Sequence, residues 1–89
     1  MNRAMKAFEC TKKSIPKVAD DIVNEIYRMI NLRAAHGHYF YTVDDILNGV
    51  SPEVIELIIK TLRSEGYSAL KDDYVNVINV NWKRPIVDA

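Results

Sequence analysis

Two histidines separated by one glycine are the residues that most readily suggest metal chemistry. His36 and His38 flank Gly37, and Asp44 and Asp45 follow a few residues later. Two imidazoles one residue apart can meet a zinc ion, but a site needs three or four ligands in tetrahedral geometry. Helix capping and aromatic packing account for both histidines. The sequence therefore predicts no metal site and no cofactor.

Cys10 is the only cysteine and the only obvious nucleophile. Lys12 and Lys13 could favour its thiolate, but a reactive thiol also needs a positioned partner and a pocket. Neither is evident in this part of the chain. A single cysteine cannot form an internal disulfide, which fits a reducing compartment or a virion assembled in one.

Paired carboxylates are the third candidate for chemistry, since they can exchange protons or bind cations. The chain has three such pairs, which are Asp20 and Asp21, Asp44 and Asp45, and Asp72 and Asp73. Two pairs fall at expected helix starts and one falls in a turn, where aspartate is favoured for its backbone contacts. We therefore assign no catalytic residue, and we expect neither an enzyme nor a small-molecule substrate.

The first element that would position these residues is a helix over residues 15–36. Ser14 would cap it, and Pro16 would lie in its first turn, where the missing N–H costs nothing. Apolar residues recur every three to four positions, and Gly37 is suited to a left-handed stop. Residues 1–13, which show no clear period, would form an N-terminal arm.

Two further helices are expected in the middle of the chain. Residues 38–43 are aromatic and β-branched, which favours a short extended segment. Thr42, three residues before Asp45, would start a short helix over 43–48 as a variant capping box. Ser51 and Pro52 would start a helix over 52–65, whose wide apolar arc places it at the core.

A β-hairpin would close the fold, with strands over 67–70 and 74–82. The apolar residues of the second strand change phase between Val77 and Ile78, which predicts a bulge or a strand covered on both faces. The expected fold class is α+β, with three helices and a C-terminal hairpin. One globular domain over 14–82 would precede a tail over 83–89.

The order helix, short strand, short helix, long helix and hairpin resembles a winged helix. The resemblance implies that helix 52–65 enters the major groove of DNA, with Lys60 and Arg63 as its contacts. The polar stripe of that helix is mixed in charge, however, and Asp72 and Asp73 stand at the wing tip in place of basic residues. A protein-interaction module is therefore favoured, with a winged-helix DNA-binding transcriptional regulator as the alternative.

The sequence also resembles small phage-encoded proteins in three short motifs. These are a small-residue and glycine helix end at 34–37, a Gly-Tyr pair at 66–67, and a hairpin that closes on tryptophan at 78–82. The resemblance implies a virion component or a protein of unknown function, and it carries over no catalytic residue.

The zero net charge hides an asymmetry between the arm and the body. Residues 1–17 carry five Lys or Arg against one Glu, whereas residues 18–89 carry seven against eleven acidic residues. An acidic body repels phosphate, so the folded part is not expected to bind a duplex. The arm could contact phosphates or an acidic protein surface.

We expect partner contacts from the arm, the aromatic segment and the tail. Of the three aromatics at 39–41, two should be buried and one exposed. The candidate partner-binding residues are Arg3, Lys6, Lys12, Lys13, Tyr39, Tyr41 and Ile86.

No apolar run approaches the ~20 residues that span a bilayer, and Met1–Lys6 lacks the apolar stretch of a secretory signal. The sequence therefore predicts no membrane contact and a cytoplasmic location, in the host cytoplasm or the virion if the protein is phage-encoded. The expected function is a small interaction or assembly component that binds a protein partner or its own copies.

Overall fold

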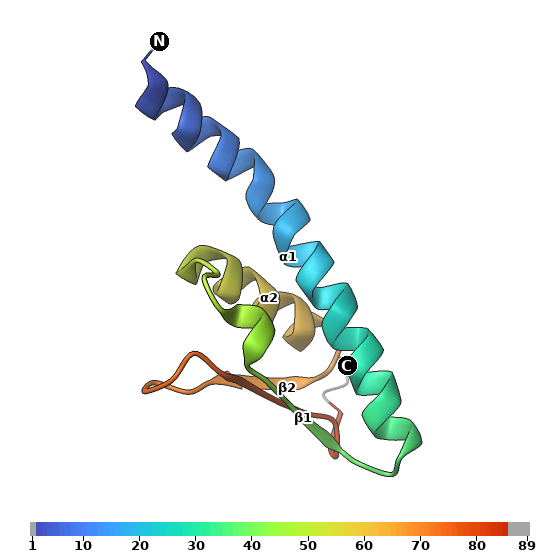
Figure 1. The fold of residues 1–89 in the computed structure, drawn as a ribbon. Coiled ribbons are helices and arrows are strands. Elements are labelled where there is room, and N and C mark those ends of the chain that lie inside the picture. The colour runs from blue at the N-terminus through green and yellow to red at the C-terminus, as the bar shows by residue number, and fades with distance from the viewer. Residues whose placement is uncertain (1, 86–89) are drawn as a thin grey trace.

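The computed structural model describes residues 2–85 of the 89-residue chain. Its elements in chain order are α1 (Arg3–Ala35), β1 (Phe40–Val43), the 3₁₀ turn η1 (Asp45–Leu47), α2 (Pro52–Ser64), β2 (Ser68–Lys71) and β3 (Ile78–Asn81). The strands form one antiparallel sheet in the order β1-β3-β2. Both helices lie on the same side of that sheet (Figure 1).

The expected α+β character is confirmed, but the expected arrangement of three helices and a C-terminal hairpin is wrong. The described residues form two α-helices and a three-stranded sheet. The segment 43–48 is not an α-helix, because Val43 pairs with Ile78 in the sheet and only one 3₁₀ turn follows. Asp44, rather than Thr42, caps that turn through its side chain.

The hairpin strands are shorter than expected, because the connection between them takes up residues 72–77. The Asp72 carboxylate accepts a hydrogen bond from the Tyr74 N–H at 2.8 Å, and the Asp72 N–H donates to the Val77 carbonyl at 3.0 Å. Val77 therefore precedes β3 instead of lying within it. This removes the apparent phase change, since β3 then alternates regularly between buried and exposed residues.

Helix α1 begins at Arg3 rather than near residue 15, so the expected start of the first helix is wrong. The Asn2 side chain caps it by accepting the Met5 N–H at 2.8 Å. Pro16 consequently lies in the interior of a continuous helix, where it leaves the Lys12 carbonyl without its usual donor. The helix end agrees with the expectation to within a residue, because Gly37 has a φ of 83° and the His38 N–H donates to the Arg33 carbonyl.

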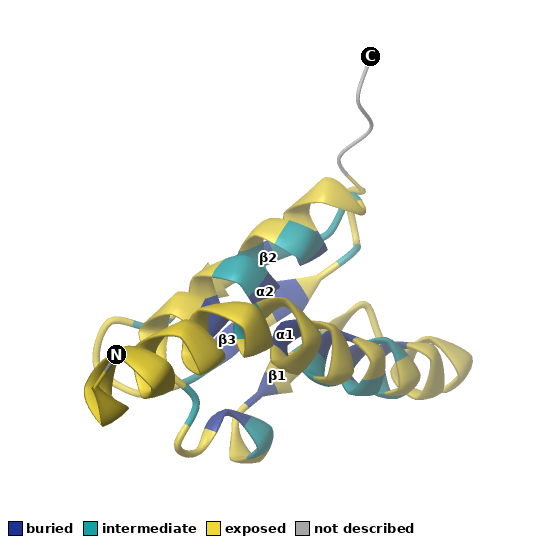
Figure 2. Ribbon diagram, turned by 90° about the horizontal axis from the view of Figure 1, so that it is seen from above, coloured by how far each residue is buried: buried dark blue, intermediate teal, exposed yellow. Residues whose placement is uncertain are grey.

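The core is a single apolar cluster between the two helices and the sheet (Figure 2). Among the described residues it contains no buried polar or charged side chain. Tyr67 borders this cluster, with its ring edge-on to that of Trp82 at a centroid distance of 6.1 Å. The buried residues are Ala19, Val23, Ile26, Ile30, Val43, Leu47, Val54, Ile55, Ile58, Leu62, Ala69, Ile78 and Val80.

The molecule is elongated because α1 extends beyond the core. Its radius of gyration is 14.9 Å, whereas a compact domain of this length has about 12 Å. The long axis measures 53 Å, close to the ~50 Å expected for the 33 residues of α1. Every residue from Asn2 to Ser14 is exposed, so the first turns of α1 project past the rest of the molecule (Figure 1). Within residues 2–85, neither helix has the length and apolarity needed to cross a bilayer.

Candidate functional site

The first candidate surface is the projecting helix, by which we mean residues 3–14 of α1. Met5 and Phe8 are 47% and 57% exposed on it. Their spacing from half-buried Ile15 and buried Ala19 is that of one helix face. The apolar stripe that faces the core therefore continues past the body as an exposed stripe.

The opposite face of the projecting helix is basic. Lys6, Cys10 and Lys13 follow one another at spacings of four and three residues, which places them together on that face. Cys10 is exposed. The helix is therefore amphipathic, although the Lys12 ammonium lies on the apolar side, 5.7 Å from the centroid of the Phe8 ring.

One cation of the projecting helix contacts the body. The Lys12 ammonium lies 3.1 Å from the Glu53 carboxylate in the first turn of α2. Both side chains are more than half exposed, and such a pair contributes only about 0–1 kcal/mol. The projecting helix is thus positioned mainly by its continuity with the packed part of α1.

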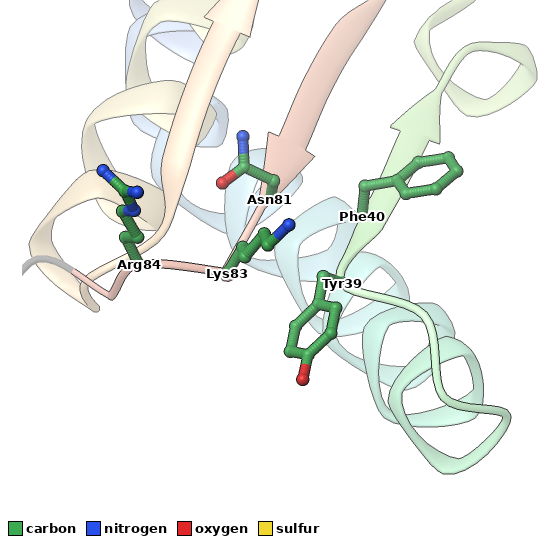
Figure 3. Close-up of a pocket in the computed structure, with 5 residues that line it drawn as sticks. All are labelled: Tyr39, Phe40, Asn81, Lys83 and Arg84. Carbon is green, nitrogen blue, oxygen red and sulfur yellow. The ribbon is translucent and has the colours of Figure 1, made fainter.

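The second candidate surface is an open groove of about 360 Å³ at one end of the sheet, lined by Tyr39, Phe40, Asn81, Lys83 and Arg84 (Figure 3). We call it the aromatic groove. Tyr39 and Phe40 are 57% and 56% exposed. Two segments that are far apart in the sequence meet here, because the Trp82 N–H donates to the Tyr39 carbonyl at 2.9 Å.

The expectation that two of the three aromatics at 39–41 are buried is wrong. Strand residues alternate between faces, so Phe40 and Thr42 point to the uncovered side of β1, while Val43 joins the core. Tyr41 packs partly buried against the core, with the Arg33 guanidinium 5.8 Å from its ring centroid. Burial and the nearby Asp44 carboxylate raise the pKa of Tyr41. Phe40 was not among the candidate partner-binding residues predicted from the sequence. The available signal was the two-residue period of a strand, which places Phe40 on the face opposite Tyr41 and Val43.

Lys60 and Arg63 lie close together beside the exposed Leu70 and Lys71 of β2, with Glu56 in the same hollow. The Arg63 Nε donates to the Ala69 carbonyl at 3.0 Å, so part of this guanidinium is engaged within the fold. The hollow therefore has mixed charge, as the sequence indicated. Ile86 lies outside the described residues.

The residues first considered for catalysis or metal binding are not brought into one site. The His36 ring Nδ1 lies 2.8 Å from the Leu32 carbonyl, and the His38 ring meets the Phe40 ring edge-on at 6.0 Å. Across residues 2–85, no three His, Cys, Asp or Glu side chains are arranged so that they could hold a metal ion.

Comparison of the chain with protein-family models, with curated proteins and with solved structures gave no match. The two surfaces are therefore interpreted from their own chemistry.

Proposed function

We propose that this protein is a small, non-enzymatic assembly component, in which the projecting helix of one copy docks on the body of a neighbouring copy, whose net charge is negative. The observation that carries the proposal is the exposure of Met5 and Phe8 on a continuation of the core stripe. We include a role as a virion component in this proposal, because the resemblance to small phage-encoded proteins implies one.

The energetics of the projecting helix favour a partner. An isolated helix of this length is marginal in water, and the body offers it one exposed ion pair. Full burial of a methionine or phenylalanine side chain contributes about 1.5–3 kcal/mol. Since Met5 and Phe8 are about half exposed, covering them would supply roughly half of that for each residue. A neighbouring surface would therefore stabilise both the helix and the assembly.

The charge distribution favours head-to-tail docking between copies. Residues 1–17 have a net charge of +4 and residues 18–89 a net charge of −4. The contact between Lys12 and Glu53 is an example, within one chain, of the pairing that neighbouring chains would make. Pairing two projecting helices would instead bring two positive segments together. Head-to-tail contacts are heterologous, so they build rings or open filaments rather than closed dimers.

Replacing Phe8 with aspartate is expected to weaken self-association at least tenfold, because it places a carboxylate in the apolar stripe. Sedimentation velocity over a range of protein concentrations measures the effect. Leu32→Asp is the matched control, since Leu32 is also about half exposed on α1 but lies at its other end.

Association of the unmodified chain should also weaken with salt, because exposed charges are screened over about 10 Å at 0.1 M.

Equal weakening by Phe8→Asp and Leu32→Asp would contradict the role of the projecting helix. A short DNA duplex added to the same measurement tests the alternative function. If the duplex binds and Lys60→Ala with Arg63→Ala abolishes binding, the protein is a DNA-binding regulator and the assembly proposal fails.

A further inference from the structure

The aromatic groove lies at the basic end of an otherwise acidic body. Residues 36–43 and 78–85, which meet through the pairing of β1 with β3, contain two arginines or lysines and no aspartate or glutamate. Two other cations are engaged elsewhere, because Arg28 pairs with Glu25 and Arg33 lies against the Tyr41 ring. Lys83 and Arg84 are the two that line the groove (Figure 3). The net charge of the body therefore hides a local surface that attracts phosphate.

The uncovered face of the sheet next to the groove carries amides between apolar side chains. Asn79 and Asn81 of β3 are exposed, with Phe40 on one neighbouring strand and Leu70 on the other. The Thr42 hydroxyl donates to the Asn79 side-chain oxygen at 3.2 Å. An apolar partner would bury these amides without hydrogen-bond partners, which is unfavourable. A partner with flat faces and polar edges would avoid this cost, because its edges could form hydrogen bonds with the amides.

Nucleobases have such faces and edges. Tyr39 and Phe40 are each more than half exposed, and stacking of a base on an aromatic ring contributes about 1–3 kcal/mol. Cations beside an aromatic platform are the combination that holds a single strand, through base stacking and phosphate contacts. An acidic peptide would satisfy Lys83 and Arg84 but would make little use of the ring faces.

We propose that the aromatic groove binds single-stranded nucleic acid, with bases stacked on Tyr39 and Phe40 and with phosphates against Lys83 and Arg84. The site is separate from the projecting helix and does not depend on the proposed assembly. Tyr39 and Phe40 lie at the start of β1, whereas Lys83 and Arg84 follow the end of β3, so the pairing of these strands creates the site.

The test is fluorescence anisotropy of an end-labelled oligothymidylate of about ten nucleotides, a length within the range that one small domain covers. Phe40→Ala and Tyr39→Ala should each weaken binding about tenfold. Phe40→Leu should weaken it similarly, because leucine keeps an apolar side chain but lacks a ring. Tyr74→Ala is the matched control, since Tyr74 is almost fully exposed in the connection between β2 and β3.

The phosphate contacts are tested by the salt dependence of the same binding. Each phosphate neutralised on a single strand contributes about 0.7 to the slope of log affinity against log salt. Lys83→Ala with Arg84→Ala should therefore reduce the slope by about 1.4. Lys6→Ala with Lys13→Ala is the control, because it removes the same charge from the projecting helix. In that double variant, Phe40→Ala should still weaken oligonucleotide binding about tenfold.

Three results would overturn the proposal. The first is the absence of oligonucleotide binding at low salt. The second is equal weakening by Tyr74→Ala and Phe40→Ala in chains with unchanged far-UV circular dichroism. The third is displacement of the oligonucleotide by polyglutamate at equal charge, because the groove would then bind acidic polymers without base stacking.

Discussion

Replacing Ile26 with alanine is expected to lower the free energy of unfolding by about 2–5 kcal/mol. Ile26 is 0% exposed and lies in the part of α1 that packs on the core. The substitution removes buried apolar surface and leaves a cavity that the surrounding side chains fill only in part. A domain of this size has a small margin of stability, so the loss is a large fraction of the total.

Urea denaturation followed by the fluorescence of Trp82, the only tryptophan, measures this loss. Leu32→Ala on the same helix is the control, because Leu32 is about half exposed and should change the free energy of unfolding far less. If the two variants were equally stable, α1 would not pack on the body through the face described here.

Replacing Pro16 with alanine is expected to stabilise the protein by up to about 3 kcal/mol, the cost of proline inside a helix. In the continuous α1, alanine would supply the N–H that the Lys12 carbonyl lacks and would remove the crowding by the proline ring. If the helix instead began at Ser14, Pro16 would lie in the first turn, and the substitution would be nearly neutral.

Thermal unfolding and far-UV circular dichroism of Pro16→Ala distinguish these two cases. Pro52→Ala is the matched control, because Pro52 lies in the first turn of α2, after the Ser51 cap. We expect a higher melting temperature and higher helicity for Pro16→Ala alone. If Pro16→Ala raised neither the melting temperature nor the helicity, α1 would be interrupted at Pro16.

Local signals in the sequence correctly predicted helix boundaries that a capping residue or a glycine sets. Ser51 and Pro52 start α2, and Gly37 and Gly66 follow the two helix ends with φ values of 83° and 94°. The start of α1 was missed because Ser14 and Pro16 form a valid local start signal. Whether a helix continues through such a signal depends on what precedes it, and here the cap is Asn2.

The sheet was only partly predictable, because strand pairing joins residues that are distant in the sequence. The extended character of residues 38–43 was visible, but the pairing of Tyr41 with Val80 was not. The aromatic groove depends on that pairing, so its composition could not be predicted from local patterns. The basic character of residues 1–17 was visible in the sequence, whereas the helical continuity of this segment with the core was not.

The measurement that tests the assembly role most directly is the mass in solution, by light scattering at low salt, of the full chain and of a chain that lacks residues 1–13. The truncated helix would begin at Ser14 and Pro16, which suit a helix start, so the body should stay folded. We predict that the full chain exceeds its monomer mass of 10.2 kDa increasingly with concentration, while the truncated chain stays monomeric. A full chain that remains at 10.2 kDa throughout, or a truncated chain that assembles equally well, would contradict the proposed role of the projecting helix.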